Sequence, residues 1–109
     1  MKTKLYKGSL QTIILKLLEQ NGRMYGYQIC KSVKTLSNND INITEGALYP
    51  TLHKLESTGV IEAEFEKVSG RNRKYYKLTE KGKTETVNKT DELISFIENM
   101  QIFLKPNAI

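Results

Sequence analysis

Apolar residues recur at steps of three and four in the first half of the chain, a spacing that predicts amphipathic helices. The first helix is expected to follow Ser9 as its N-cap and to end at Gly22, a common residue after a helix C-terminus. Its apolar residues occupy more than one face, so it should be buried on two sides. The second helix is expected to cover "MYGYQICKSVKTL", residues 24–36, and the polar "SNND" after it predicts a turn.

A third helix is predicted from Thr44, a good N-cap, to about Thr58, where Gly59 closes it. The short apolar segment before it, residues 41–43, is a candidate for a brief strand. The inward stripe of the third helix consists of Leu48, Leu52 and Leu55.

Pro50 lies inside that stripe, although proline cannot donate the backbone hydrogen bond that a helix expects. Its ring should conflict with the carbonyl of Gly46, which would bend the first turn of a continuous helix. In the other interpretation the helix begins at Pro50 and the preceding residues form a separate turn. We favour the bent helix, and in both interpretations Tyr49 lies at the junction and points outward.

Two β-segments follow. In residues 61–68, Ile61, Ala63 and Phe65 alternate with three glutamates, which predicts a half-buried strand with an acidic outer face. The sequence "SGRN" predicts a turn, and "RKYYKL", residues 73–78, predicts the returning strand of a hairpin.

Thr79 is the predicted cap of a last helix over residues 80–104. A terminal helix this apolar needs more partner surface than so small a domain offers. We therefore expect an oligomer, most simply a twofold dimer; the alternative is a helix folded back on the first helix of the same chain. Its two apolar lines consist of Val87, Ile94, Ile97 and Leu104, and of Leu93, Phe96, Met100 and Phe103.

The 109-residue chain has the length of one small domain and a net charge of +5. Residues 1–83 hold 15 Lys/Arg against 8 Asp/Glu, whereas residues 84–109 hold 2 against 4. The excess of positive charge therefore lies in residues 1–83, and nucleic acid is the first candidate partner.

Several functional classes are disfavoured by residues that the sequence lacks. No apolar run approaches the roughly 20 residues that span a bilayer, and Lys16 interrupts the N-terminal apolar run of a would-be signal peptide. The single cysteine, Cys30, cannot form an internal disulfide, which fits a reducing cytoplasm. One cysteine and one histidine, His53, make no metal-ligand set, and no nucleophile–base pair is present. We expect a cytoplasmic protein with no membrane partner, no metal, no cofactor and no enzymatic activity.

Three helices followed by a hairpin is the element order of a winged helix-turn-helix. The predicted fold class is therefore mainly α with a small β-hairpin (α+β). Residues 1–79 would form the DNA-binding domain and residues 80–109 a C-terminal dimerisation helix, together in one compact unit.

Three sequence blocks carry a more specific likeness: "YGYQI" (25–29), "GALYPTLHKLESTGVI" (46–61) and "GRNRKYYKLTEKGK" (70–83). In these blocks the chain resembles PadR-type transcriptional regulators, over essentially residues 8–83, and its single last helix is similar to that of the shorter members. The resemblance implies a dimeric bacterial-type repressor whose last helix packs against the first helix of the partner subunit.

The outward face of the third helix supplies the first candidate DNA-binding residues. A recognition helix usually contacts base edges with its N-terminal residues, here Glu45, Gly46 and Tyr49. The hydroxyls of Tyr49 and Thr44 can donate to a phosphate or a base edge, and Gly46 would let DNA approach the backbone.

The start of the second helix suits phosphate, because free N–H groups face outward there. The resemblance carries DNA contact most readily onto Tyr27 and Tyr49, and less readily onto Tyr25. One of Tyr25 and Tyr27 is expected to pack in the core.

The hairpin tip supplies the remaining candidates, Arg71, Arg73 and Lys74, which can reach phosphates or enter a minor groove. An acidic strand face laid along phosphates would be repelled, so only the tip is expected to meet DNA. That acidic face consists of Glu62, Glu64 and Glu66.

Members of the resembled family often release DNA when they bind a ligand, in some cases a flat aromatic compound between the subunits. The first and last helices offer an apolar lining for a small apolar or aromatic effector, although a plain dimer core is the favoured interpretation. The chain has no tryptophan, which argues against a sensor that stacks its ligand on one. The candidate effector or dimer-interface residues are Leu10, Ile14, Leu93, Phe96, Ile97, Met100 and Phe103.

These observations predict a dimeric repressor that reads a palindromic operator in double-stranded DNA, with half-sites roughly 34 Å apart. The alternative is a winged-helix protein-interaction module without sequence-specific DNA binding. Such a module would show no sequence preference on DNA and no steep salt dependence.

Overall fold

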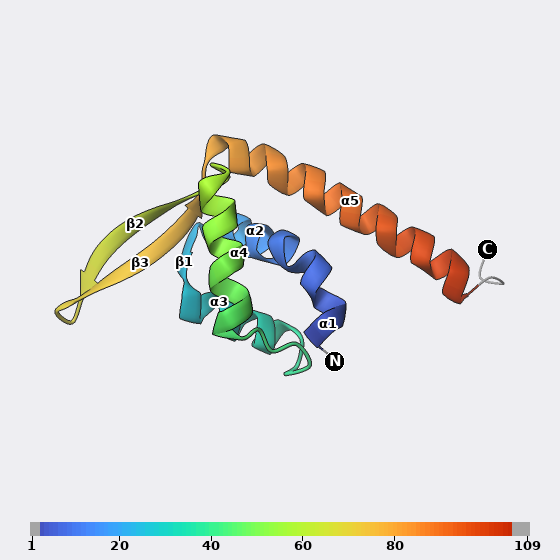
Figure 1. The fold of residues 1–109 in the computed structure, drawn as a ribbon, viewed down its shortest axis with the longest axis horizontal. Coiled ribbons are helices and arrows are strands. Elements are labelled where there is room, and N and C mark those ends of the chain that lie inside the picture. Colours follow the sequence, from blue (N-terminus) through green and yellow to red (C-terminus); the bar gives the residue numbers. More distant parts are fainter. Residues whose placement is uncertain (1–2, 106–109) are drawn as a thin grey trace.

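Three helices enclose one hydrophobic core, from which a β-hairpin and a long terminal helix project in different directions (Figure 1). The computed structural model describes residues 3–105. A three-stranded antiparallel sheet with strand order β1-β3-β2 flanks the helices, which confirms the predicted α+β class. The elements are α1 (Thr3–Tyr6), the 3-10 turn η1 (Lys7–Ser9), α2 (Leu10–Asn21), β1 (Arg23–Tyr25), α3 (Gly26–Leu36), α4 (Glu45–Ser57), β2 (Ile61–Val68), β3 (Arg71–Leu78) and α5 (Glu80–Leu104).

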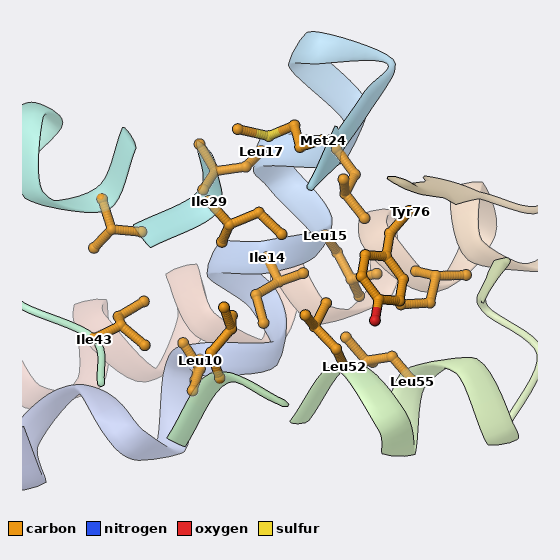
Figure 2. Close-up of a cluster of buried hydrophobic side chains, with 14 of the residues drawn as sticks. Leu10, Ile14, Leu15, Leu17, Met24, Ile29, Ile43, Leu52, Leu55 and Tyr76 are labelled. Atoms are coloured by element: carbon orange, nitrogen blue, oxygen red, sulfur yellow. The ribbon is translucent and has the colours of Figure 1, made fainter. Parts of the chain in front are cut away.

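Helix α2 lies at the centre of the core and is buried on more than one face, as predicted. Ser9 precedes it, but the Ser9 side chain makes no capping hydrogen bond, because the chain enters α2 directly from the η1 turn. Gly22 follows α2 with a φ of 83°, a conformation that glycine adopts without a steric penalty. Figure 2 shows side chains from α2, α3, α4 and the sheet pointing toward one another. The buried residues of α2 are Leu10, Ile14, Leu15, Leu17 and Leu18.

The strand β1 was not predicted, and the expected start of the second helix at residue 24 is wrong. Met24 pairs with Tyr76 of β3 in an antiparallel register and is buried, so α3 begins only at Gly26. The expected brief strand at residues 41–43 is also absent from the described chain. Ile43 is instead a buried core residue of an irregular segment.

Helix α4 is continuous with Pro50 inside it, so the interpretation in which the helix begins at Pro50 is wrong. The bend stays a prediction. The predicted N-cap is confirmed, because the Thr44 hydroxyl accepts a hydrogen bond from the Ala47 N–H at 3.2 Å.

The hairpin of β2 and β3 turns through Ser69 and Gly70, both at positive φ. Ile61 and Tyr76, near its base, are buried against the core. Phe65 was expected on the half-buried face, but its side chain is 68% exposed. The hairpin projects from the helical core (Figure 1), and burial along β2 falls from Ile61, which is buried, to Phe65.

Helix α5 begins as predicted, with the Thr79 hydroxyl accepting from the Gly82 N–H at 3.0 Å. Gly82 and Thr86 are buried, and α5 contacts α2 of its own chain. Most apolar side chains farther along α5 remain exposed, so the contact with α2 does not bury the apolar surface of the helix. Among the described residues, no helix is long and apolar enough to cross a membrane.

Candidate nucleic-acid interface

An open hollow of about 270 Å³ lies where the start of α3, the first half of α4 and strand β3 meet. It brings together five of the side chains that the sequence indicated, from three separate segments. Its other three residues were not anticipated, because their place depends on the packing of β3 beside α3 and α4. The lining consists of the predicted Tyr25, Tyr27, Tyr49, Arg73 and Lys74, and of Gly26, Asn72 and Tyr76.

Tyr49 lies on the outward face of α4, as predicted, with its side chain 46% exposed. The hydroxyl end of its ring lies next to Gly26 at the start of α3, so close that it fills the space of a β-carbon there. Partial burial, and then the nearby Glu45 carboxylate, raise the pKa of the Tyr49 phenol. The hydroxyl is therefore a neutral hydrogen-bond donor and acceptor at neutral pH.

The residues before Tyr49 on α4 form an open surface. Thr44, Glu45 and Gly46 are all exposed. A β-carbon on Gly46 would meet nothing closer than the Thr44 hydroxyl, 3.9 Å away, so the backbone of this turn is accessible. One hydroxyl, one carboxylate and bare backbone thus precede the Tyr49 ring.

The two tyrosines at the start of α3 differ in environment. Tyr27 is 66% exposed, and its ring stacks on that of Tyr25 with centroids 6.4 Å apart. Tyr25 is half-buried, with its ring edge-on to Tyr75 at 5.4 Å. Neither belongs to the hydrophobic core cluster, so the expectation that one would pack there is wrong. Tyr25 packs on the outer face of the sheet instead.

The three wing cations predicted to bind DNA, Arg71, Arg73 and Lys74, occupy different environments. The Arg73 guanidinium lies 4.1 Å from the centre of the Tyr25 ring, a cation–π geometry, and donates to the Tyr75 hydroxyl at 3.4 Å. The Lys74 ammonium lies 3.4 Å from a carboxylate oxygen of Glu56 on α4. Arg71, next to the turn, is exposed.

The three glutamates of β2 are not a bare acidic face. Arg23 of β1 donates to Glu64 at 2.9 Å and to Glu66, and the Lys77 ammonium lies 3.2 Å from Glu64 and 3.7 Å from Glu62. The hydrogen bond from Arg23 lowers the pKa of the Glu64 carboxyl. This outer face is therefore less repulsive to phosphate than its sequence suggested. Arg23 was missed because its partners are known only from the strand register.

The predicted effector or dimer residues divide between core and surface. Leu10 and Ile14 are 3% and 0% exposed, so one folded chain already covers them. Leu93 and Phe96 of α5, together with Leu5, are the apolar residues of an open groove of about 770 Å³, whose other lining residues are mostly polar or charged. The others lie farther along α5, where Met100 is half-buried and Ile97 and Phe103 are exposed.

The described residues include one histidine and one cysteine, which lie in different environments. They contain no group of three His, Cys, Asp or Glu placed to hold a metal ion. His53 is exposed, and Cys30 is partly buried against the core, where burial raises the pKa of its thiol.

The sequence and the fold both have close counterparts. Residues 14–88 match the family model described as "Transcriptional regulator PadR-like family". An uncharacterized protein of Lysinibacillus sphaericus is 34% identical over 106 residues, which is 96% of each chain. A transcriptional regulator from Clostridium thermocellum superposes with a TM-score of 0.87 at 28% identity, over 96% of this chain and 99% of that one. A PadR family transcriptional regulator from Eggerthella lenta gives 0.79 at 28% identity, over 95% and 88%.

Proposed function

The chain belongs to the PadR-like family of transcriptional regulators, and we propose that it is a dimeric repressor that binds DNA sequence-specifically. One observation carries the proposal. Exposed tyrosines of α3 and α4 and an arginine of β3 converge on one hollow, next to an open helix N-terminus. Aromatic hydroxyls beside a guanidinium, on the outer surface of a helix-turn-helix, suit a groove edge and its phosphates.

In this proposal the start of α4 enters the major groove. Tyr49 contacts a base edge, with Thr44, Glu45 and Gly46 alongside, and Tyr27 contacts a flanking phosphate. The wing tip reaches the adjacent backbone or minor groove through Arg71.

The dimer in this proposal forms through residues 80–109 and places two winged domains, residues 1–79, on the two halves of a palindrome. The support is the row of exposed apolar side chains along α5, which one chain leaves uncovered. A small apolar effector would enter the groove beside Leu93 and Phe96 and shift the domains, which would release the DNA. A reducing cytoplasm is the compartment in which such a regulator would act.

The proposal is tested by selecting bound fragments from a random DNA pool and then measuring gel shifts on the enriched site. We expect a palindromic sequence to emerge. Tyr49→Ala should then weaken binding to it by about tenfold or more, because a good base contact contributes roughly 1–3 kcal/mol. Because the ring is half exposed, the thermal unfolding midpoint should change little.

Lys34→Ala is the matched control, since this exposed residue lies near the other end of α3 and should keep the parent affinity. A pool without any enriched sequence, or full affinity in Tyr49→Ala, would contradict the proposal. The first result, together with a weak salt dependence, would favour a protein-interaction module.

A further inference from the structure

Gly26 occupies a position where a side chain has no room. A β-carbon built on Gly26 would lie 2.6 Å from the Tyr49 hydroxyl oxygen, 3.1 Å from Cζ and 3.3 Å from Cε1. Gly26 is the first residue of α3 and does not have a positive φ, so its backbone conformation does not require glycine. What requires glycine here is the space that the Tyr49 ring fills.

We propose that Gly26 is a positioning residue for DNA recognition: its bare α-carbon is the surface on which the Tyr49 ring rests, and this contact fixes the direction of the hydroxyl. The inference depends on the proposed DNA contact of Tyr49. It assigns to Gly26 a role that acts through the position of the Tyr49 ring.

If Gly26 gains a side chain, the Tyr49 ring should move, because α3 and α4 are held in place by their buried contacts. Leu48, next to Tyr49 on α4, and Ile29, one turn along α3, are both fully buried. Separating α3 from α4 would open that core, whereas turning a half-exposed ring about its own bonds costs little. An added methyl group should therefore displace the ring and leave the helices in place.

Displacement matters because a free tyrosine side chain samples several rotamers. Fixing a side chain on binding costs conformational entropy, and a ring that already rests on Gly26 avoids part of that cost. A ring in another rotamer also presents its hydroxyl to a different part of the groove. Both effects lower specific affinity without changing the charge that attracts DNA.

The test is a double-mutant cycle of Gly26→Ala and Tyr49→Ala on the selected operator. Gly26→Ala alone should weaken specific binding by roughly tenfold, comparable to loss of one base contact. In the Tyr49→Ala background it should have no further effect, because the ring it displaces is gone. Gly8→Ala is the control, since nothing lies within 4 Å of a β-carbon there.

A second measurement needs no DNA. With ring-¹³C-labelled tyrosine, Gly26→Ala should shift the Tyr49 ring resonance, identified by its loss in Tyr49→Phe. The resonance of Tyr6, which is buried in the core, should stay in place. An unmoved Tyr49 signal would overturn the inference.

The remaining outcomes separate the inference from the function on which it rests. If Tyr49→Ala binds DNA normally, the proposed DNA contact fails; if Tyr49→Ala weakens binding and Gly26→Ala does not, only the inference fails. Equal losses in both backgrounds would mean that Gly26 acts through the fold, which would overturn it. If Gly26→Ala does not fold, the double variant decides: its folding supports the contact with Tyr49, and its failure to fold overturns it.

Discussion

The three predicted wing cations, Arg71, Arg73 and Lys74, differ in how strongly they already interact with other groups of the protein. Arg71 has neither an ion pair nor a hydrogen bond from its side chain among the described residues, whereas Lys74 faces the Glu56 carboxylate and Arg73 covers the Tyr25 ring. A DNA phosphate would therefore interact with the full charge of Arg71. At Lys74 and Arg73 it must compete with the Glu56 carboxylate and the Tyr25 ring. The wing cations should therefore contribute unequally to DNA affinity.

Arg71→Gln should lower affinity for all DNA sequences and reduce the slope of log K against log salt by about one, the value for one phosphate contact. Lys74→Gln should reduce the slope less, because the Glu56 carboxylate already neutralises part of the Lys74 charge in the parent protein. Binding curves at several salt concentrations measure both, with Lys34→Gln as a control on an exposed lysine outside the wing. Equal slopes for Arg71→Gln and the parent protein would remove the tip from the interface.

Among individual side chains, the sequence predicted those whose direction is set within one element. The outward direction of Tyr49 followed from three inward leucines on the same helix. Arg23 and Gly26 were not predicted, because their roles come from partners far away in the chain. Arg23 meets Glu64 across 41 positions, and Gly26 meets a ring of another helix.

The helices and strands show the same difference between features set by local sequence and features set by distant partners. Helices α4 and α5 carry their own caps, Thr44 and Thr79, and their own periodic pattern, so both were predicted closely. Strand β1 has only three residues and exists because β3 pairs with it. Nothing in "RMY" distinguishes it from the helix that follows, so no local pattern could predict it.

The junction between the hairpin and α5 gives a stability prediction. A β-carbon on Gly82 would run into the backbone carbonyl of Val60, which already accepts a hydrogen bond from the Thr79 N–H at 3.2 Å and cannot easily retreat. Gly82→Ala should therefore destabilise the fold by on the order of 1–3 kcal/mol, the usual cost of overpacking.

The midpoint of urea unfolding, at an unchanged m-value, measures this difference. Gly46→Ala is the matched control, because this exposed helical glycine has open space around it and alanine should be neutral or stabilising by up to about 1 kcal/mol. A Gly82→Ala variant as stable as Gly46→Ala would show that the helix start can shift away from Val60.

On the scale of the whole molecule, the chain is elongated, with extents of 58 × 30 × 21 Å and a radius of gyration of 15.5 Å. A compact chain of this length would have a radius of roughly 13 Å. The excess comes from the wing and from α5, which leave the core in different directions (Figure 1). A row of uncovered apolar residues on a projecting helix is typical of an interaction surface. These residues are Val87, Ile94, Phe96, Ile97, Ile102, Phe103 and Leu104.

We expect a second copy of α5 to provide that cover, so a double variant with Phe96→Glu and Ile97→Glu should convert a dimer into single chains. Light scattering after size exclusion measures the mass. Binding to the full palindrome should fall by roughly a hundredfold, because each domain then binds its half-site without the effective concentration that linkage supplies. Binding to an isolated half-site should change little. Leu36→Glu, at a comparably exposed apolar residue on α3, should leave the dimer intact. A parent protein with the mass of one chain, or a double variant that stays dimeric, would contradict the expectation that a second copy of α5 covers these residues.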